Sequence, residues 1–287
     1  MRSTPEPTCE VAAAPGVDEL KAKAAALRRT ILRMCAESGG HLVSSFSCVE
    51  VLVALYYGGG LRLRPESSRW TELDKFILSK GHAETALFAV LADLHYFPRE
   101  WLHSSYRRNG CMLGGHPDHR IPGVEVTSGS LGHGLGIAAG MALAARLDQR
   151  DQRIYTLLGD AECTEGSVWE AAMFAAHQRL DNLVAVIDRN GLGCLDFTDN
   201  YTGLEPLADK WRAFGWDVQC VDGHSFGELL EAARPPANSG SGLPRVIIAR
   251  TVKGKGVSFL ENDPSWHVRQ ISGEEAAAAE RELEVLV

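Results

Sequence analysis

An aspartate and an asparagine follow two successive apolar runs of this sequence, and together they could hold a metal ion. Asp160 comes two residues after the run 154–158, and Asn190 comes two residues after the run 183–188. The Asp160 carboxylate, the Asn190 side-chain oxygen and the Leu192 backbone carbonyl would give a hard cation three oxygen ligands. Mg²⁺ takes about six oxygen ligands, and phosphate and water usually supply the rest. The pattern therefore predicts a magnesium site that faces a phosphate group.

A Gly-Asp pair alone would be weak support for such a site, because an aspartate after a strand is more often a turn former or a helix cap. The asparagine at the end of the next run favours the metal, since ligands of parallel sheets lie beyond the carboxyl ends of the strands. Gly159 and Gly191, beside the two polar residues, would let the backbone approach a ligand closely.

Five of the ten histidines lie in loops beside glycine or tryptophan: His41, His82, His116, His133 and His267. A single loop histidine is usually solvated or structural, but imidazole also suits proton transfer near neutral pH. A metal role is less favoured, because no two of them are spaced as helical metal ligands among acidic residues. His116 and His119 are three apart, but Pro117 would break a helix between them.

Composition indicates an acidic globular protein. The formal net charge is −8 and the pI about 5.7, which argues against nucleic acid or anionic membrane as the main partner. The seven cysteines form no C-x-x-C pair, which favours reduced thiols in the cytosol over disulfides or a zinc site. The N-terminus lacks the apolar core of a signal peptide. No run reaches the ~18 apolar residues of a membrane span, so we expect a cytoplasmic protein.

Short apolar runs alternate with helical patterns along most of the chain. We expect strands at 75–79, 154–158, 183–188, 217–221 and 245–250. We expect helices from Val17, at 46–57, 83–94, 135–147, 167–179, 206–214, 226–233 and 273–287. This alternation predicts one doubly wound α/β domain, a parallel sheet with helices on both faces, over residues 17–287. Residues 1–16 predict a disordered tail, and residues 235–242 predict a surface loop.

Two further motifs are weak. Gly134-x-Gly136-x-x-Ala139 loosely matches a dinucleotide-binding fingerprint, but it follows no strand and lacks an acidic residue about 20 positions later. We interpret it as the start of a helix whose small residues allow close packing. Lys253-Gly254-Lys255-Gly256 lacks the spacing of a phosphate-binding P-loop, so a surface segment and a cofactor-side loop are equally compatible with it.

Several long segments resemble the transketolase family. GDAECTEGSVWEAAMFAAHQRLDNLVAVIDRNGL is similar to the thiamine-diphosphate motif, which begins Gly-Asp-Gly and ends in Asn after such a spacing. Further segments match the family in order: SGGHLVSSFSCVEVLVALYY, KFILSKGHAETALFAVLA, GGHPDHRIPGVEVTSGSLGHGLGIAAGMALA and ARTVKGKGVSFLENDPSWH. The likeness begins near residue 18 and is closest to N-terminal, diphosphate-binding subunits of split transketolases.

The resemblance implies a thiamine-diphosphate-binding fold, with thiamine diphosphate and Mg²⁺ (or Ca²⁺ or Mn²⁺) as cofactors. It implies metal ligation by Asp160, Asn190 and the Leu192 carbonyl. It implies cofactor contacts for Gly129, Leu131, Gly159, Asp160, Ala161, Asn190, His82 and His267, and catalytic roles for His41, His82, His116, His267 and Glu165.

Within this set, the resemblance gives the histidines and Glu165 different roles. His41, His82 and His116 would hydrogen-bond the sugar, and His267 would touch the diphosphate and assist proton transfer. Glu165 would couple two cofactor sites across a dimer. The resemblance leaves His133 as unassigned pocket lining. Ala161 replaces the usual third glycine of the motif, and its methyl group is tolerable only at negative φ.

The resemblance accounts for only the first of the two domains that form the family's active site. In the family, a glutamate of the second domain activates the cofactor. The implied protein is half of a transketolase-like transferase, which moves a two-carbon ketol unit from a ketose phosphate to an aldose or a specialised acceptor. It would act with a C-terminal transketolase-like subunit in an α2β2 assembly. Two alternatives remain open: the α subunit of a 2-oxo-acid dehydrogenase, and a non-catalytic regulatory or binding subunit.

Overall fold

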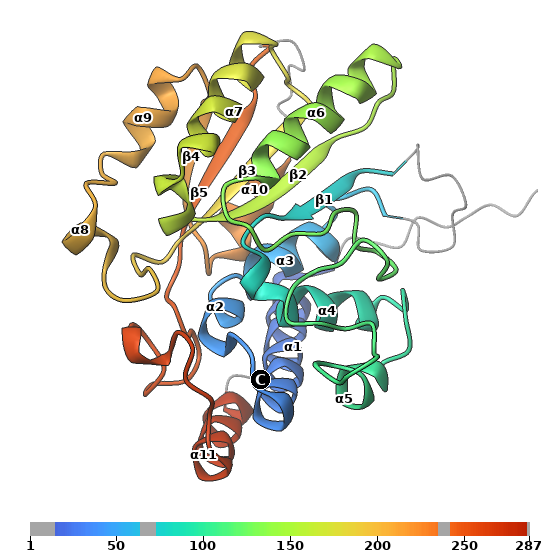
Figure 1. The fold of residues 1–287 in the computed structure, drawn as a ribbon, viewed down its shortest axis with the longest axis vertical. Coiled ribbons are helices and arrows are strands. Elements are labelled where there is room, and N and C mark those ends of the chain that lie inside the picture. The colour runs from blue at the N-terminus through green and yellow to red at the C-terminus, as the bar shows by residue number, and fades with distance from the viewer. Residues whose placement is uncertain (1–14, 64–72, 235–241, 286–287) are drawn as a thin grey trace, which may run out of the picture.

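A five-stranded parallel sheet forms the centre of the molecule (Figure 1). The structure, a computed structural model, describes residues 15–63, 73–234 and 242–285. The strands are β1 (Lys75–Leu78), β2 (Ile154–Gly159), β3 (Leu183–Arg189), β4 (Asp217–Asp222) and β5 (Arg245–Arg250), in the spatial order β1-β2-β3-β5-β4. Neighbouring strands all pair in parallel. Each strand lies within one residue of its predicted position.

Successive residues of the central strands point to opposite faces of the sheet, and both faces are apolar. In β2, Tyr155 and Leu157 pack into one helical layer, whereas Ile154 and Leu158 pack into the other, and all four are fully buried. A parallel strand that is buried on both faces requires a continuous apolar run rather than alternation. This requirement is why the apolar runs of the sequence predict the strands.

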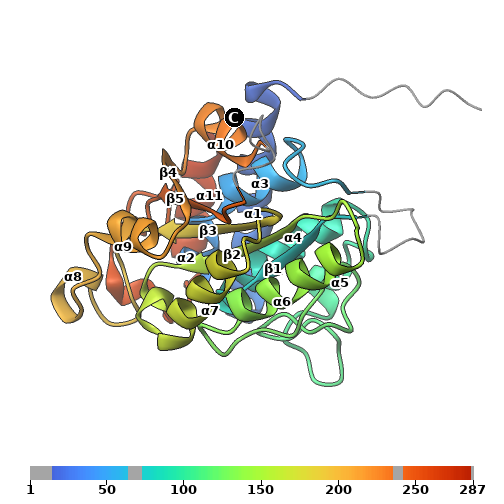
Figure 2. The ribbon, with the colours of Figure 1, turned by 90° about the horizontal axis from the view of Figure 1, so that it is seen from above.

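Helices cover both faces of the sheet (Figures 1 and 2). On one face lie α1 (Val17–Ser38), α3 (Val49–Tyr56), α4 (Glu84–Asp93) and α10 (Phe226–Ala233), and α11 (Gly273–Glu284) packs against α1. On the other face lie α6 (Gly134–Leu147), α7 (Gly166–His177) and α9 (Leu207–Ala213). The predicted doubly wound α/β fold is confirmed.

One predicted helix is wrong in its extent. Instead of a single helix over 46–57, the chain forms α2 (Leu42–Phe46) and α3, with a break at Ser47. The Ser47 hydroxyl donates to Asp188 Oδ2 (2.5 Å), which lies near the end of β3. This contact between distant segments turns the chain where the apolar pattern alone would continue one helix.

Short segments fill the connections between these elements. They are α5 (Trp101–Ser104), α8 (Thr198–Tyr201) and 3₁₀ turns at Gly81–Ala83, Ala161–Thr164 and Pro264–Trp266. Residues 1–14 of the predicted tail and 235–241 of the predicted loop lie outside the described residues. Within the described ranges, no helix is long and apolar enough to cross a membrane. The cysteines that the structure describes are all free thiols, as predicted.

Helix α6 packs closely on the end of β1 through Gly134. A β-carbon at this position would lie 2.3 Å from Ser79 Oγ and 2.8 Å from Ser79 Cα, whereas a β-carbon at Gly140 of the same helix would meet nothing within 4 Å. Gly134→Ala should therefore lower the free energy of unfolding by about 1–3 kcal/mol, as overpacking does. Gly140→Ala should be neutral or raise it by about 0.5–1 kcal/mol. Urea denaturation of both variants measures this, and equal stabilities would contradict it.

Candidate functional site

A cavity of about 290 Å³ lies at the carboxyl ends of β1, β2 and β3. It is lined by His41, Ser44, Lys80, His82, His116, Gly129, Leu131, Gly159, Asp160, Ala161, Glu162, Asn190, Leu192, Gly193, Cys194, Lys253 and His267. Eleven of the twelve predicted site residues are in this lining, and Glu165 is the exception. The fold thus gathers residues from distant segments at the edge where parallel sheets bind their ligands.

Asp160 and Asn190 are held at neighbouring strand ends. Asp160 Oδ2 accepts from the Gly191 backbone N–H (2.7 Å), and Asn190 Oδ1 accepts from that of Leu192 (3.1 Å). Burial raises the pKa of Asp160, and hydrogen bonds from Arg189 and Gly191 oppose the rise. These two residues and Leu192 line the same cavity and offer it three oxygen donors, of which the Leu192 carbonyl also accepts from the Lys253 ammonium group (3.4 Å).

This donor group fits a hard cation. The part of the chain that the structure describes contains no cluster of three His, Cys, Asp or Glu side chains that could hold a metal. A metal at this site would therefore rely on one carboxylate, one amide oxygen and one backbone carbonyl. Such an all-oxygen set suits Mg²⁺ completed by phosphate and water, and lacks the nitrogen and sulfur ligands that zinc prefers.

The substitution of Ala161 for glycine causes no backbone conflict. Ala161 begins a 3₁₀ turn, and it is not among the described non-glycine residues with positive φ. Its backbone N–H donates to Asp160 Oδ1 (2.8 Å). The methyl group is therefore accommodated at the position where the motif usually has glycine.

Four histidines form a compact cluster in the cavity. The His41 ring lies 5.5 Å from His82, 6.2 Å from His116 and 5.7 Å from His267, measured between ring centroids. Burial, reinforced by neighbouring histidines and cations, lowers the pKa of His41 to about 4 and of His267 to about 3. Burial also lowers the pKa of His82 and of His116. All four imidazoles are therefore neutral near pH 7.

A buried ion pair lies beneath the cavity. Lys80 and Asp188, both at most 1% exposed, form a direct salt bridge. Burial alone would raise the pKa of Asp188, but Lys80 and hydrogen-bond donors such as Ser47 and Thr251 lower it below its ordinary value. Asn190 Nδ2 also donates to Asp188 Oδ2 (3.1 Å). This hydrogen bond fixes the orientation of the Asn190 amide group, with its oxygen on the side opposite to Asp188.

Glu162 joins three strand-end loops and was missed in the sequence. Its carboxylate accepts hydrogen bonds from the Ser79 hydroxyl, the Gly132 backbone N–H (2.8 Å) and the Gly159 backbone N–H (3.0 Å). The side chain is 1% exposed, and burial raises its pKa. A single buried carboxylate therefore sets the spacing between the loop that contains Gly129 and Leu131 and the ends of β1 and β2.

Lys253 of the Lys-Gly-Lys-Gly motif lies inside the cavity and not on the surface. It is 2% exposed, and its ammonium group donates to the Gly193 carbonyl (2.9 Å) and to His267 Nδ1 (2.8 Å). Because Nδ1 of His267 accepts this bond, the neutral ring carries its proton on Nε2. Burial and then the charge of Lys80 lower the pKa of Lys253 to about 8.

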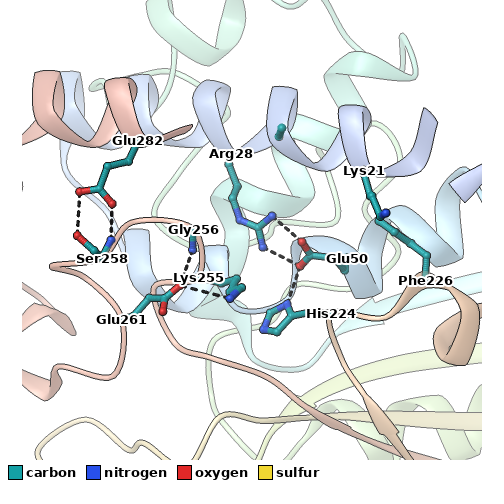
Figure 3. A pocket seen from close by; sticks show the side chains of 11 residues that line it. Lys21, Arg28, Glu50, His224, Phe226, Lys255, Gly256, Ser258, Glu261 and Glu282 are labelled. Atoms are coloured by element: carbon teal, nitrogen blue, oxygen red, sulfur yellow. Dashed lines mark hydrogen bonds and ion pairs between the residues drawn. The ribbon is translucent and has the colours of Figure 1, made fainter. Parts of the chain in front are cut away.

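A chain of hydrogen bonds links α1 and α3 to the residue that precedes Lys253. Figure 3 shows Arg28, Glu50 and His224 of this chain. Arg28 forms a bidentate pair with Glu50 (2.6 and 2.7 Å), and Glu50 Oε2 accepts from His224 Nδ1 (3.0 Å). The Val252 backbone N–H then donates to His224 Nε2 (2.9 Å). The chain ends one residue before Lys253, so packing between α1, α3 and the segment before α10 helps to position that side chain.

Three buried polar atoms at or beside the cavity have no hydrogen-bond partner among the described residues: His41 Nδ1, Ser44 Oγ and Ser128 Oγ. Buried polar atoms in native proteins are nearly always paired, and a polar ligand or water in the cavity could supply the partner of these three. Together with the oxygen donors and Lys253, they fit a diphosphate-bearing cofactor and its metal ion.

Two predicted residues lie outside the cavity. Glu165 precedes the first residue of α7 and is exposed, beside Gly132 rather than among the lining residues. His133 precedes α6 and is also exposed, so its interpretation as pocket lining is wrong.

Known proteins resemble this chain along nearly its whole length. Residues 23–285 match the family model described as transketolase, thiamine diphosphate binding domain. The chain is 43% identical to the 6-deoxy-6-sulfo-D-fructose transketolase subunit SqwG of Clostridium sp. (strain MSTE9), over 93% of this chain and 96% of that protein. It is 42% identical, with the same coverage, to an apulose-4-phosphate transketolase subunit of Actinobacillus succinogenes.

Transketolases that consist of one long chain match over less than half of their length. Human transketolase is 38% identical over 86% of this chain and 39% of its own. The crystal structure of the Campylobacter jejuni transketolase superposes with a TM-score of 0.84 at 28% identity, over 94% of this chain and 43% of that one. The chain thus has the length of the relatives named as subunits, and it matches only one part of the longer ones.

Proposed function

Because the chain belongs to the transketolase family, as the N-terminal subunit of a split transketolase, we propose that it forms the cofactor-holding half of a two-subunit transferase. The reaction is transfer of a two-carbon ketol unit from a ketose phosphate to an aldose or a specialised acceptor. The observation that carries this proposal is the gathering of eleven predicted residues around one cavity. The two subunit-named relatives are named for different sugars, so the individual donor and acceptor are left open.

In this proposal the cavity holds Mg²⁺ and thiamine diphosphate. Asp160, Asn190 and the Leu192 carbonyl hold the metal, and the Lys253 ammonium compensates charge on the diphosphate. Gly129 and Leu131 line the ring side of the cofactor. When bound, thiamine diphosphate supplies the thiazolium carbon that adds to the ketose carbonyl and carries the two-carbon unit. The unpaired buried atoms around the cavity support this occupant.

The histidines handle the substrate protons in this proposal. A neutral imidazole donates a hydrogen bond at one nitrogen and accepts one at the other. His41, His82 and His116 can therefore bind sugar hydroxyls in either sense, and they can move a proton between a hydroxyl and a carbonyl oxygen. His267, with its proton fixed on Nε2 by Lys253, would contact the diphosphate and assist proton transfer.

The surface of α6 and α7 supports an assembly with further subunits. The two helices pack side by side, and they expose Ile137 (39%), Met173 (54%) and Phe174 (42%). Exposed apolar side chains on two adjacent helices are compatible with an interaction surface. Glu165 lies at the first turn of α7, so this face would bring it toward another subunit. We propose an α2β2 assembly in which a C-terminal partner subunit completes the site with its activating glutamate.

Turnover by the purified chain tests the proposal. Alone, the chain should bind Mg²⁺ and cofactor weakly and show no ketol transfer, because the activating glutamate belongs to the partner. Adding the C-terminal subunit should produce transfer by an assembly whose mass equals two copies of each chain. Ketol transfer by the chain alone would refute the half-enzyme proposal. Decarboxylation of a supplied 2-oxo acid by the assembly, without ketol transfer, would favour the dehydrogenase alternative.

A further inference from the structure

Arg189 places a positive charge directly on the proposed metal-binding carboxylate, and the proposed function does not use it. Arg189 is the last residue of β3, and its side chain is 13% exposed. Its Nη1 donates to Asp160 Oδ2 (2.8 Å), an oxygen that also accepts from the Gly191 N–H (2.7 Å). Asp160 therefore already has a cation as a neighbour before any metal is considered.

The same guanidinium group also contacts two further carboxylates. Arg189 Nη2 lies 2.9 Å and Nε 3.0 Å from Glu205 Oε1, whose side chain is 54% exposed, and Nη2 lies 3.6 Å from Asp199 Oδ1. Nη1 also donates to the Thr198 hydroxyl (3.0 Å). Arg189 and Glu205 also line a neighbouring hollow of about 440 Å³. The guanidinium group thus has room to withdraw from Asp160 while it remains paired with Glu205.

We propose that Arg189 is an internal cation that lowers the affinity of the Asp160 site for a divalent metal, and that Glu205 limits this effect by drawing the guanidinium group away. The inference rests on the proposed function. Two cations a few Å apart repel strongly in a buried site, where solvent screening is weak. A guanidinium group bound to the carboxylate also compensates part of the negative charge that a metal would otherwise meet.

A purely supporting role for Arg189 predicts the opposite sign. Side chains that hydrogen-bond a metal ligand often orient it, and their loss typically weakens metal binding about 10–100-fold. If Arg189 mainly orients Asp160, its replacement must therefore weaken metal binding. If Arg189 mainly competes with the metal, its replacement must strengthen it.

Binding of Mn²⁺ to the assembled two-subunit enzyme, in the presence of thiamine diphosphate, separates the two roles. Free Mn²⁺ is counted by electron paramagnetic resonance, so no activity is needed. Arg189→Gln keeps hydrogen-bond donors but removes the charge, and it should tighten Mn²⁺ binding at least about tenfold, because a like charge a few Å from the metal costs about this much even where water screens it strongly. Arg189→Lys keeps the charge but not the forked geometry of the guanidinium group, so it should tighten Mn²⁺ binding less than Arg189→Gln does.

Glu205→Gln should weaken Mn²⁺ binding about threefold, because it removes only a half-exposed ion pair and leaves Arg189 with Asp160 and with the exposed Asp199. Glu231→Gln is the matched control, since Glu231 pairs with Arg234 (2.9 Å) on the surface of α10, and it should change nothing. Thermal unfolding verifies that each variant is folded, and if Arg189→Gln does not fold, the sign of the Glu205→Gln effect decides alone.

Three outcomes would overturn the inference. Weaker Mn²⁺ binding by Arg189→Gln, or tighter Mn²⁺ binding by Glu205→Gln, would give Arg189 a supporting role. Unchanged Mn²⁺ binding by both variants would show that the charge of Arg189 does not affect the metal site. Absence of Mn²⁺ binding by the wild-type enzyme would refute the metal site itself, and with it this inference, whereas the first two outcomes leave the proposed function intact.

Discussion

Replacing Asp160 by alanine should abolish ketol transfer by the assembled enzyme, with kcat/KM reduced on the order of 1,000-fold or more. Asp160 is the only carboxylate in the proposed ligand set, and neither the Asn190 amide nor the Leu192 carbonyl carries a charge. A metal contributes several kcal/mol of charge stabilisation at such a site, and each 1.36 kcal/mol corresponds to a factor of ten in rate. Initial rates with saturating thiamine diphosphate, over a range of Mg²⁺ concentrations, provide the measurement.

Two further variants test whether the loss of activity comes from the charge of Asp160. Asp160→Asn keeps an acceptor for the Ala161 N–H but lacks the charge, so high Mg²⁺ should rescue it only in part. Asp181→Ala removes an exposed carboxylate before β3, at the opposite end of the strand, and it should leave kcat/KM unchanged. Full activity of Asp160→Ala would instead favour the alternative of a non-catalytic subunit whose metal site is inert.

The site residues near the strand ends could be predicted because the fold and the site both depend on the apolar runs that form the strands. The runs 154–158 and 183–188 are apolar without alternation since both faces of β2 and β3 are buried. Once such runs are recognised as neighbouring parallel strands, their carboxyl ends must share one edge of the sheet. Asp160 and Asn190 therefore follow from the order of the chain.

Other site residues could not be predicted because their positions depend on contacts between distant segments. Glu162 joins Ser79 and Gly132 through hydrogen bonds, and nothing in its neighbours in sequence indicates this. Lys253 lies in a glycine-rich motif that is equally typical of a surface loop. Its burial depends on how the segment packs against His267 and the loop after β3.

The sequence did contain a signal for the Lys80–Asp188 salt bridge, which was not predicted. Asp188 ends the apolar run 183–188, and Lys80 follows a short apolar run at 75–79. A charged side chain in a strand that is buried on both faces requires an oppositely charged partner, because an unpaired buried charge is very costly. The Lys80–Asp188 salt bridge satisfies this requirement. Searching apolar runs for isolated charges of opposite sign would have suggested it.

Replacing Asp188 by alanine should lower the free energy of unfolding by about 3–5 kcal/mol, the cost of breaking a buried ion pair from one side. Asp188 is fully buried and accepts hydrogen bonds from Lys80, Ser47, Thr251 and Asn190. Without it, the Lys80 ammonium group keeps, among the described residues, the Ser44 carbonyl as its hydrogen-bond acceptor (3.0 Å). Urea denaturation followed by circular dichroism measures the loss.

The comparison of this loss with two other variants identifies its cause. Asp209→Ala breaks a surface pair with Arg212, whose side chains are 69% and 54% exposed, so its cost should stay within about 1 kcal/mol. Lys80→Met combined with Asp188→Leu removes both buried charges and should recover part of the stability that Asp188→Ala loses. If the double variant is no more stable than Asp188→Ala, the uncompensated ammonium group is not the source of the loss. The lost hydrogen bonds to Ser47 and Thr251 would then account for it, and the Lys80–Asp188 pair would contribute little to the rigidity of the sheet edge on which the site is built.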